Sequence, residues 1–255
     1  MLKETGILFD VTLCVGCGSC YKKCKQVNNL PQTNKDFLKD HLSENTYTVV
    51  EQYGSKFARK QCMHCDEPAC ASVCLVGAIK KSPTGAVIYD GDKCIGCRYC
   101  MQACPHKIPR YEWASTKPRI RKCILCNERV KAGQLPGCAE ICPTEAILFG
   151  EMDKLIEVAK NRMKYNPEKY YQKIYGLEDA GGGHVLILSP VPFEQLGYVA
   201  KLPKEAMPEF TMRAMEKIPS VVVGGGVFLS AMYWLTKRKN QIAKEKNLTN
   251  GNKDI

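Results

Sequence analysis

The sequence predicts an α+β protein built from two copies of a cysteine-rich module and ending in a single transmembrane helix. Three observations predict this class. The 255 residues include 16 cysteines in four groups of four, two of these groups repeat at a constant offset, and residues 218–236 carry no charge. With 45% hydrophobic and 25% charged residues, the composition is close to the globular average, which excludes wholesale disorder and collagen-like repeats.

The cysteine groups have the spacing of iron–sulfur ligands. Groups one and three read C-x2-C-x2-C-x3-C, group two reads C-x2-C-x4-C-x3-C, and group four reads C-x2-C-x11-C-x3-C. In chain order they are Cys14, Cys17, Cys20 and Cys24; Cys62, Cys65, Cys70 and Cys74; Cys94, Cys97, Cys100 and Cys104; and Cys123, Cys126, Cys138 and Cys142. Three thiolates at x2 spacing wrap one cubane, and the fourth ligates the other cluster, as in bacterial two-cluster ferredoxins. At four thiolates per cluster, the 16 cysteines predict four [4Fe–4S] clusters.

Two other uses of cysteine fit the spacing less well. Disulfide frameworks usually space their cysteines along loops, whereas C-x2-C-x2-C crowding gives each thiol several local partners. Zinc takes two Cys pairs, which would suit groups two and four alone but not groups one and three. Proline follows the run at Pro105 and Pro143, as the ferredoxin pattern expects, although Lys25 and Leu75 stand at the other two places.

An internal repeat organises the cysteine groups. Groups one and three are offset by 80 residues at every cysteine, and the offset extends upstream, where residues 7–10 match residues 87–90. Groups two and four share an offset of 68 at their last two cysteines, which Ala78-Ile79 and Ala146-Ile147 keep. We therefore expect residues 1–150 to form a four-cluster body of duplicated two-cluster ferredoxin-like modules, with halves near 7–79 and 87–149.

The spacing does not fix which loop donates the fourth ligand to which cluster. The 19 residues between Cys74 and Cys94 match the separation inside a two-cluster ferredoxin, which favours exchange between groups two and three and leaves groups one and four as partners. The expected ligand sets are then Cys14, Cys17, Cys20 and Cys142; Cys24, Cys123, Cys126 and Cys138; Cys62, Cys65, Cys70 and Cys104; and Cys74, Cys94, Cys97 and Cys100.

No catalytic or nucleotide site is predicted. Residues 181–183 are three glycines without the G-x-G-x-x-G context, and we expect a flexible turn into a strand at 185–188. His64 and His106 lie in or beside cluster loops, where packing is favoured over a role in tuning a cluster by hydrogen bonding. No Ser/His/Asp set or carboxylate pair in the sequence forms part of a recognisable catalytic motif. We therefore expect the substrate chemistry to take place in another polypeptide. Segment 25–61 is polar and predicts no function.

Residues 151–217 are expected to contribute a helix, a strand and an extended segment that pack on the body or on a partner. An amphipathic helix is predicted over 151–164, where apolar residues recur at helical spacing. They are Met152, Leu155, Ile156, Ala159 and Met163.

Residues 218–236 predict the transmembrane helix. At about 1.5 Å per residue, nineteen residues span roughly 28 Å, close to the hydrocarbon thickness of a bilayer. Gly224–Gly226 would allow close approach of another helix, and Tyr233 and Trp234 stand where an aromatic belt belongs. The alternative, a buried core helix, is disfavoured by the charge-free length and by the abrupt basic tail at 237–255.

The flanking charges predict an orientation. Residues 237–246 hold five Lys and Arg, against two in residues 208–217, which favours a cytoplasmic C-terminus and a cluster body outside the cytoplasm. The first residues show no apolar or twin-arginine signal. Because clusters need reduced thiols for assembly, we expect export of the folded protein bound to a partner that carries the signal.

The net charge of +11 does not indicate a nucleic-acid partner. A [4Fe–4S]²⁺ cube with four thiolates carries about −2, so four clusters bring roughly −8. The tail 236–255 holds six Lys and Arg and two Asp and Glu, a net +4, which leaves +7 for residues 1–235. The basic excess is therefore mostly counter-charge for clusters, and the tail suits an anionic membrane face.

The chain resembles the four-cluster iron–sulfur subunits of membrane-bound bacterial oxidoreductases, above all those of the hydrogenase-2 type and of respiratory formate dehydrogenases. The resemblance covers nearly the whole chain, and its most specific pieces are residues 60–65, 96–101 and 135–138. The segments 181–186 and 191–194 look closest to the hydrogenase-associated version.

The resemblance implies an electron-transfer subunit rather than a catalytic one. Electrons would pass through four clusters between a catalytic subunit, hydrogenase favoured and formate dehydrogenase next, and an integral membrane quinone-reactive subunit such as a cytochrome b. It also implies the ligand sets given above, and a single pass of the bacterial inner membrane through 218–236 with the body facing the periplasm. Alternatives are the iron–sulfur subunit of another molybdenum oxidoreductase or a stand-alone polyferredoxin.

Overall fold

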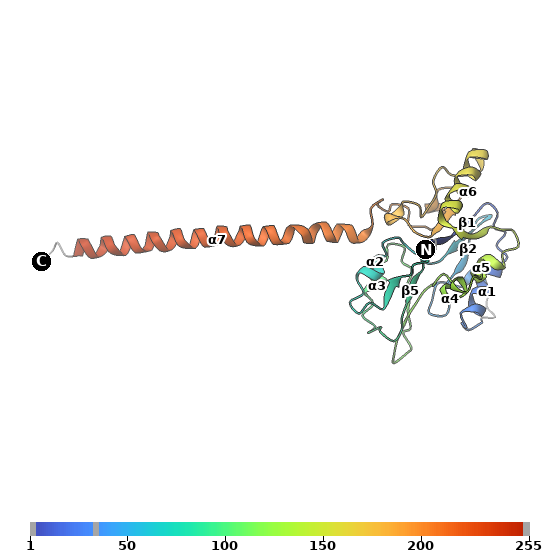
Figure 1. Ribbon diagram of the computed structural model, residues 1–255, viewed down its shortest axis with the longest axis horizontal. Coiled ribbons are helices and arrows are strands. Elements are labelled where there is room, and N and C mark those ends of the chain that lie inside the picture. The colour runs from blue at the N-terminus through green and yellow to red at the C-terminus, as the bar shows by residue number, and fades with distance from the viewer. Residues whose placement is uncertain (1–3, 33–35, 252–255) are drawn as a thin grey trace. The chain divides into compact units, whose positions relative to one another are not determined.

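A three-stranded sheet joins the two ends of the cysteine-rich body. The computed structural model describes residues 4–32 and 36–251, and within them β1 (Thr5–Asp10) lies between β8 (Ile147–Glu151) and β9 (Val185–Leu188) (Figure 1). β1 pairs with β8 antiparallel, with Ile7 opposite Phe149, and with β9 parallel, with Ile7 opposite Val185. The central strand is a continuous apolar run because both of its faces are buried.

The two faces of this sheet carry two separate apolar clusters. Side chains alternate along a strand, so Ile7 and Phe9 face one cluster and Leu8 faces the other. On the Leu8 face the sheet packs against α6 (Met152–Tyr165), which buries Leu155 and Ala159. The helix α6 occupies the segment in which the sequence predicts an amphipathic helix.

Short elements complete the body. Three antiparallel pairs surround the main sheet: β2 (Val49–Tyr53) with β3 (Lys56–Lys60), β4 (Ile79–Lys81) with β5 (Val87–Tyr89), and β6 (Arg110–Tyr111) with β7 (Ile120–Arg121). The short α-helices are α1 (Ser19–Val27), α2 (Ala69–Ser72), α3 (Tyr99–Ala103), α4 (Asn127–Lys131) and α5 (Gly137–Glu140). The 3-10 helices are η1 (Phe37–Lys39), η2 (Pro167–Lys169), η3 (Asp179–Gly181) and η4 (Phe193–Leu196).

Backbone conformations recur at the offsets of the sequence repeat. α1 and α3 each follow a residue in the left-handed region, Gly18 (φ 71°) and Arg98 (φ 65°), which are 80 residues apart. α2 and α5 each follow an extended proline, Pro68 and Pro136, which are 68 residues apart. The same cysteine spacing is therefore built with the same local turns.

Strand pairing crosses the two sequence halves. β1 leads into the first cysteine group and β8 follows the fourth, whereas β4 follows the second group and β5 leads into the third. The β1–β8 and β4–β5 pairs thus each take one strand from each half, whereas β2–β3 and β6–β7 each stay within one half. Consistent with this interleaving, Met1–Pro208 forms one compact unit, so residues 151–208 belong with the cysteine groups.

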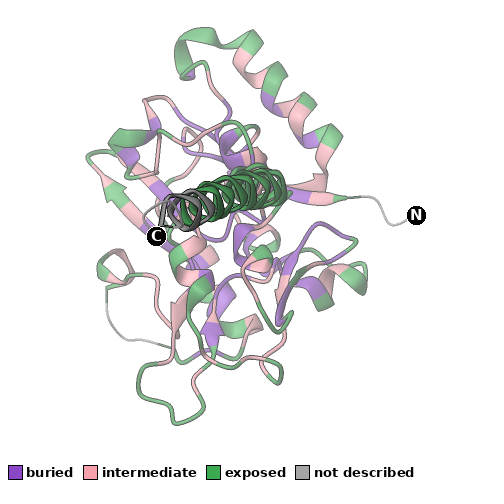
Figure 2. Cartoon of the chain, turned by 90° about the vertical axis from the view of Figure 1, so that its left-hand side faces the viewer, coloured by how far each residue is buried: buried purple, intermediate pink, exposed green. Residues whose placement is uncertain are grey.

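The second unit, Glu209–Ile255, is dominated by α7 (Met207–Gly251), a 45-residue helix that contains the predicted span 218–236. Helix-forming Met, Arg, Glu, Lys and Gln residues flank the apolar stretch, which explains why the helix extends beyond it at both ends. It is the one helix of the described chain that is long and apolar enough to cross a membrane. Figure 2 shows exposed residues along its described length, and a single helix by itself cannot bury Val221, Phe228 and Leu229.

Asp10 fixes the end of β1 immediately before the first cysteine loop. Its Oδ2 accepts hydrogen bonds from Arg162 Nη1 at 2.8 Å and from the Tyr170 hydroxyl at 2.9 Å. Its Oδ1 accepts from the backbone N–H and the hydroxyl of Thr12. Asp10 is fully buried, whereas its repeat equivalent Asp90 is only partly buried.

We expect Asp10→Ala to lower the free energy of unfolding by about 2 kcal/mol, because it leaves the partly buried Arg162 without its counter-ion. Asp90→Ala removes a solvent-accessible ion pair with Lys93 and an exposed hydrogen bond from the backbone N–H of Asp92, and should change the free energy of unfolding by about 0.5 kcal/mol. Urea unfolding of the solubilised full-length chain, followed by circular dichroism, measures both. Equal losses at the two positions would contradict this account of Asp10.

Candidate iron–sulfur centres

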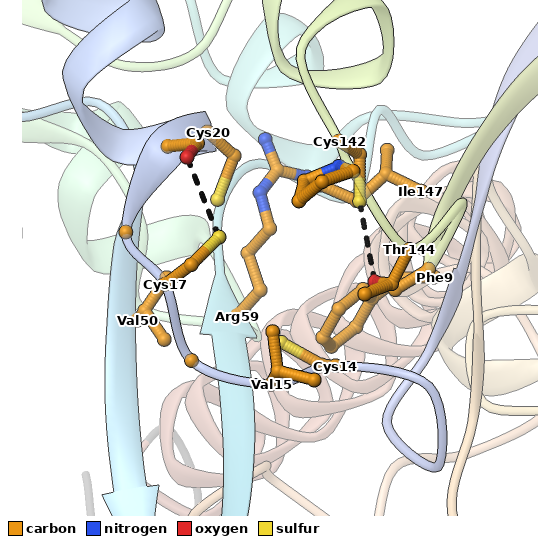
Figure 3. Close-up of a pocket in the computed structure, with 15 residues that line it drawn as sticks. Phe9, Cys14, Val15, Cys17, Cys20, Val50, Arg59, Cys142, Thr144 and Ile147 are labelled. Carbon is orange, nitrogen blue, oxygen red and sulfur yellow. Dashed lines mark hydrogen bonds between the residues drawn. The ribbon is translucent and has the colours of Figure 1, made fainter.

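The loop of the first cysteine group and the segment that leads into β8 enclose a cavity lined by cysteines. Cys14, Cys17 and Cys20 line it from one side and Cys142 from the other, around an empty volume of about 370 Å³ (Figure 3). We call these four residues set A. The antiparallel pairing of β1 with β8 is what brings Cys142 to a loop more than a hundred residues earlier in the chain.

Glycine is required in the set A loop. Gly16 and Gly18 have φ values of 69° and 71°, in the left-handed region that side chains disfavour. A Cβ on Gly16 would also lie 2.4 Å from the ring of Phe57, and one on Gly18 would lie 2.8 Å from the ring of Phe37. Part of the polar segment 25–61 thus covers the loop and restricts it to glycine.

A second cavity, of about 310 Å³, lies between α1 and the fourth cysteine group. It is lined by Cys24, Cys123, Cys126 and Cys138, which we call set B. The C-x2-C turn here has no glycine, and Leu125 and Cys126 themselves adopt positive φ values of 55° and 47°. Cys24, Cys123 and Cys138 are buried.

A third cavity, of about 320 Å³, lies beside the β4–β5 pair. It is lined by Cys74, Cys94, Cys97 and Cys100, which we call set D. Gly96 and Arg98 hold positive φ values of 72° and 65°, at the positions equivalent to Gly16 and Gly18. The sequence difference at Arg98 therefore leaves the turn unchanged.

We call the remaining cysteines, Cys62, Cys65, Cys70 and Cys104, set C. Cys62 and the partly buried Cys104 lie in one apolar cluster. Burial raises the pKa of Cys65 well above its ordinary value, and the other three thiolates of the set raise it further. Burial raises the pKa of Cys70 to about 12, with further contributions from Cys62 and Cys104.

The geometry of the sets suits a polynuclear cluster. A zinc ion needs four sulfurs converging at about 2.3 Å from one point. Three of the four sets instead each surround a cavity. The donor set is all sulfur, as [4Fe–4S] clusters require.

Neighbouring sets adjoin in the order A, B, C, D, which we call the row. The cavities of sets A and B share Arg59, cysteines of sets B and C share one buried cluster, and cysteines of sets C and D share another. Between neighbouring sets, a thiolate of one raises the pKa of a buried thiol in the other, in addition to the larger effect of burial. These pairs are Cys20 with Cys138, Cys123 with Cys62, and Cys70 with Cys100. Cys17 in set A and Cys97 in set D are exposed. The row therefore has one exposed cysteine at each end.

The two histidines beside the cysteine loops hold buried structural contacts. His64 Nδ1 accepts a hydrogen bond from the backbone N–H of Val87 at 2.9 Å, and burial lowers the pKa of His64 well below its usual value. The neutral ring therefore carries its proton on Nε2. His106 Nδ1 lies 3.1 Å from the Tyr175 hydroxyl, and burial lowers its pKa to about 4. Both contacts agree with the packing role that the sequence favours.

The glycine run 181–183 packs closely against a cysteine loop, and the strand predicted at 185–188 is β9. Gly183 forms a β-bridge with Cys65, and the N–H of His184 donates to the carbonyl of His64 at 3.0 Å. A Cβ on Gly183 would lie 2.7 Å from the carbonyl oxygen of Met63. Glycine is needed here because two backbones approach closely, a requirement that sequence context alone does not reveal.

Arg59 is a site residue that sequence reasoning missed. It lies on β3, three residues before Cys62, and lines the cavities of both set A and set B. The available signal was a charged residue at the end of a strand that runs directly into a cysteine group. Patterns of cysteine spacing contain no information about Arg59.

Comparisons with known proteins give a consistent result. The family described as 4Fe–4S dicluster domain matches residues 54–152. A protein of Nitratidesulfovibrio vulgaris is 41% identical over 254 residues, covering 94% of this chain and 69% of that protein. The hydrogenase-2 operon protein HybA of Escherichia coli O157:H7 is 39% identical, covering 75% and 71%. The iron–sulfur subunit of the nitrate-inducible formate dehydrogenase of Escherichia coli K12 is 35% identical, covering 72% and 67%.

We expect Gly183→Ala to displace the loop that carries Cys62 and Cys65, and so to cost the chain about one cluster, or roughly four iron atoms. Gly150→Ala is the matched control, because the nearest atom to its Cβ is Leu155 Cδ2 at an ordinary 3.9 Å. Iron and acid-labile sulfide per purified chain give the readout. A Gly183→Ala protein with its full iron content would refute the close-approach argument.

Proposed function

We propose the function of this protein from one premise: the chain belongs to the family of four-cluster iron–sulfur subunits of membrane-bound bacterial oxidoreductases. Its function is electron transfer between a catalytic subunit and the membrane. The observation that carries the proposal is the row of four cysteine sets, with Cys17 exposed at one end and Cys97 at the other. Such a row connects two surfaces of one protein through a buried path.

Each set would hold one [4Fe–4S] cluster, which when bound supplies a one-electron carrier. The ligand sets are those predicted from the sequence: Cys14, Cys17, Cys20 and Cys142; Cys24, Cys123, Cys126 and Cys138; Cys62, Cys65, Cys70 and Cys104; and Cys74, Cys94, Cys97 and Cys100. With all four sulfurs of each set used as ligands, no iron keeps an open position for substrate. We therefore place the substrate chemistry in another subunit.

The chain's own residues shield the middle of the row and expose its ends. Apolar side chains and cysteines of sets B and C share one buried cluster with Leu30, Tyr47 and Ile108, which excludes water from the centre. At the ends, Val15 beside set A is 60% exposed and Ile95 beside set D is 64% exposed. Exposed apolar side chains of this kind suit contact with a partner protein at each end.

We assign the body to duplicated two-cluster ferredoxin-like modules. Sets A and B share the β1–β8 pair and the contact of α1 with α5, and sets C and D share the β4–β5 pair and the contact of α2 with α3. The shared turns at the offsets of 80 and 68 support a duplication with sequence halves near 7–79 and 87–149. In this proposal, 151–217 packs on the body or a partner.

The partners follow from the relatives' names and from α7. A hydrogenase subunit is favoured and a formate dehydrogenase subunit is next, ahead of other molybdenum oxidoreductases or a stand-alone polyferredoxin. On the membrane side we propose a quinone-reactive subunit such as a cytochrome b. The span 218–236 would cross the bacterial inner membrane once, with the basic tail 237–255 in the cytoplasm and the body in the periplasm.

Metal analysis tests the cluster count. We expect about sixteen iron atoms and a matching amount of acid-labile sulfide per chain, because four all-cysteine sets bind four cubanes. The measurement is made on protein purified anaerobically in mild detergent. Zinc with little iron would contradict the proposal outright, and about eight iron atoms would leave only two of the sets as cluster sites.

Protease protection tests the orientation. When protease is added to intact spheroplasts, we expect it to digest the cluster body, while an epitope placed after Ile255 survives until the cells are lysed. A soluble periplasmic marker and a cytoplasmic marker serve as controls for leakage. A protected cluster body with a digested epitope would reverse the assigned topology.

A further inference from the structure

Arg59 is a cation buried between two cysteine sets. Its side chain extends from β3 toward the space ringed by set A, and its guanidinium lies between Cys20 and Cys142 (Figure 3). The residue is only 2% exposed. It lines the cavity of set A and, from the same position, the cavity of set B. Among the residues that the structure describes, no other charged side chain lines both cavities.

The guanidinium lacks protein partners for part of its donor set. Nε and Nη1 of Arg59 are buried and donate no hydrogen bond to any acceptor in the described residues. Buried charges in proteins are normally paired and hydrogen-bonded, because desolvation otherwise disfavours them. The two donors are therefore available to groups that the two cavities would hold.

The ionisable groups that act on Arg59 are cysteines of sets A and B. Burial alone would lower the pKa of Arg59, but thiolates of both sets raise it above its usual value, so the guanidinium stays charged. The four that act most strongly are Cys138, Cys20, Cys123 and Cys24. A guanidinium offers five donors in a planar fork, which suits acceptors on two sides better than a lysine ammonium does.

Lys122, a buried cation that acts on Cys70 of set C, provides a contrast. It is buried and lowers the pKa of Cys70, which burial raises. Its ammonium donates to the carbonyl oxygens of Val87 and Cys123, so backbone acceptors already hold it. Arg59 differs because Nε and Nη1 have no such acceptor.

We propose that Arg59 is a positioning residue that raises the reduction potentials of the two clusters held by sets A and B, by donating its free N–H groups to sulfur atoms in both cavities. The proposal rests on the proposed function, since it requires clusters in these sets. Reduction adds one electron to a cluster that already carries negative charge. A fixed cation between two clusters stabilises the reduced form of each, and hydrogen bonds to sulfur act in the same direction.

The test is a redox titration of the full-length protein followed by electron paramagnetic resonance, with iron and sulfide assayed on the same samples. Arg59→Gln should shift the reduction equilibrium of two clusters at least tenfold toward the oxidised form, which equals 59 mV for a one-electron couple, and leave the others unchanged. Arg59→Lys keeps the charge but not the fork, so the same two clusters should shift less. Arg121→Gln removes an arginine already paired with Glu112 and should shift none.

The outcomes separate the two proposals. Wild-type protein without iron and sulfide would refute the proposed function, whatever Arg59 does. Arg59→Gln protein with full iron and unshifted potentials would overturn the role of Arg59 alone. If Arg59→Gln does not retain its iron, Arg59→Lys decides the matter: a lowered potential at two clusters supports the proposal, and unchanged potentials overturn it.

Discussion

The buried negative charge of the cysteine sets is the constraint on which the rest of the structure depends. Burial raises the pKa of Cys20 and Cys123 to about 12, so these thiols ionise only where positive charge is supplied to them. Iron supplies most of it when clusters bind, and buried cations supply the remainder. Arg59 and Lys122 are both buried beside cysteines of these sets, which agrees with the interpretation of the formal charge of +11 as mostly counter-charge for clusters.

The topology solves a second problem, which is how to bring distant cysteine groups together. β1 pairs with β8 and so joins the first group to the fourth, while β4 pairs with β5 and joins the second to the third. The strand β9 then closes the sheet beside β1, and Gly183 at its start lies against the loop of Cys65. The segment after the cysteine groups is thus part of the cluster body, which explains why both occupy one compact unit.

Much of the site could be predicted from the sequence because cysteine spacing is local and chemically restrictive. Three cavities are lined by cysteine sets that the spacing predicts. In the fourth set, the other three cysteines contribute to raising the pKa of Cys65. The assignment of these cysteines as cluster ligands stays a prediction. Arg59 and Gly183 could not be predicted in the same way. Their roles depend on contacts that strand β3 and the start of strand β9 make with cysteine loops. Such tertiary contacts leave no periodic pattern in the sequence. Likewise, the composition of residues 218–236 predicts the apolar span. The full length of α7 depends on the helix-forming residues on either side, and composition does not show where the helix begins and ends.

The central claim is that four iron–sulfur clusters lie in one row, in the order of sets A, B, C and D. An anomalous difference map of the crystalline, cluster-loaded protein at the iron absorption edge tests it most directly. The account predicts four iron peaks, one within each set, with the outer two beside the exposed Cys17 and Cys97. Fewer than four peaks, or four peaks whose nearest sulfurs mix members of different sets, would contradict it.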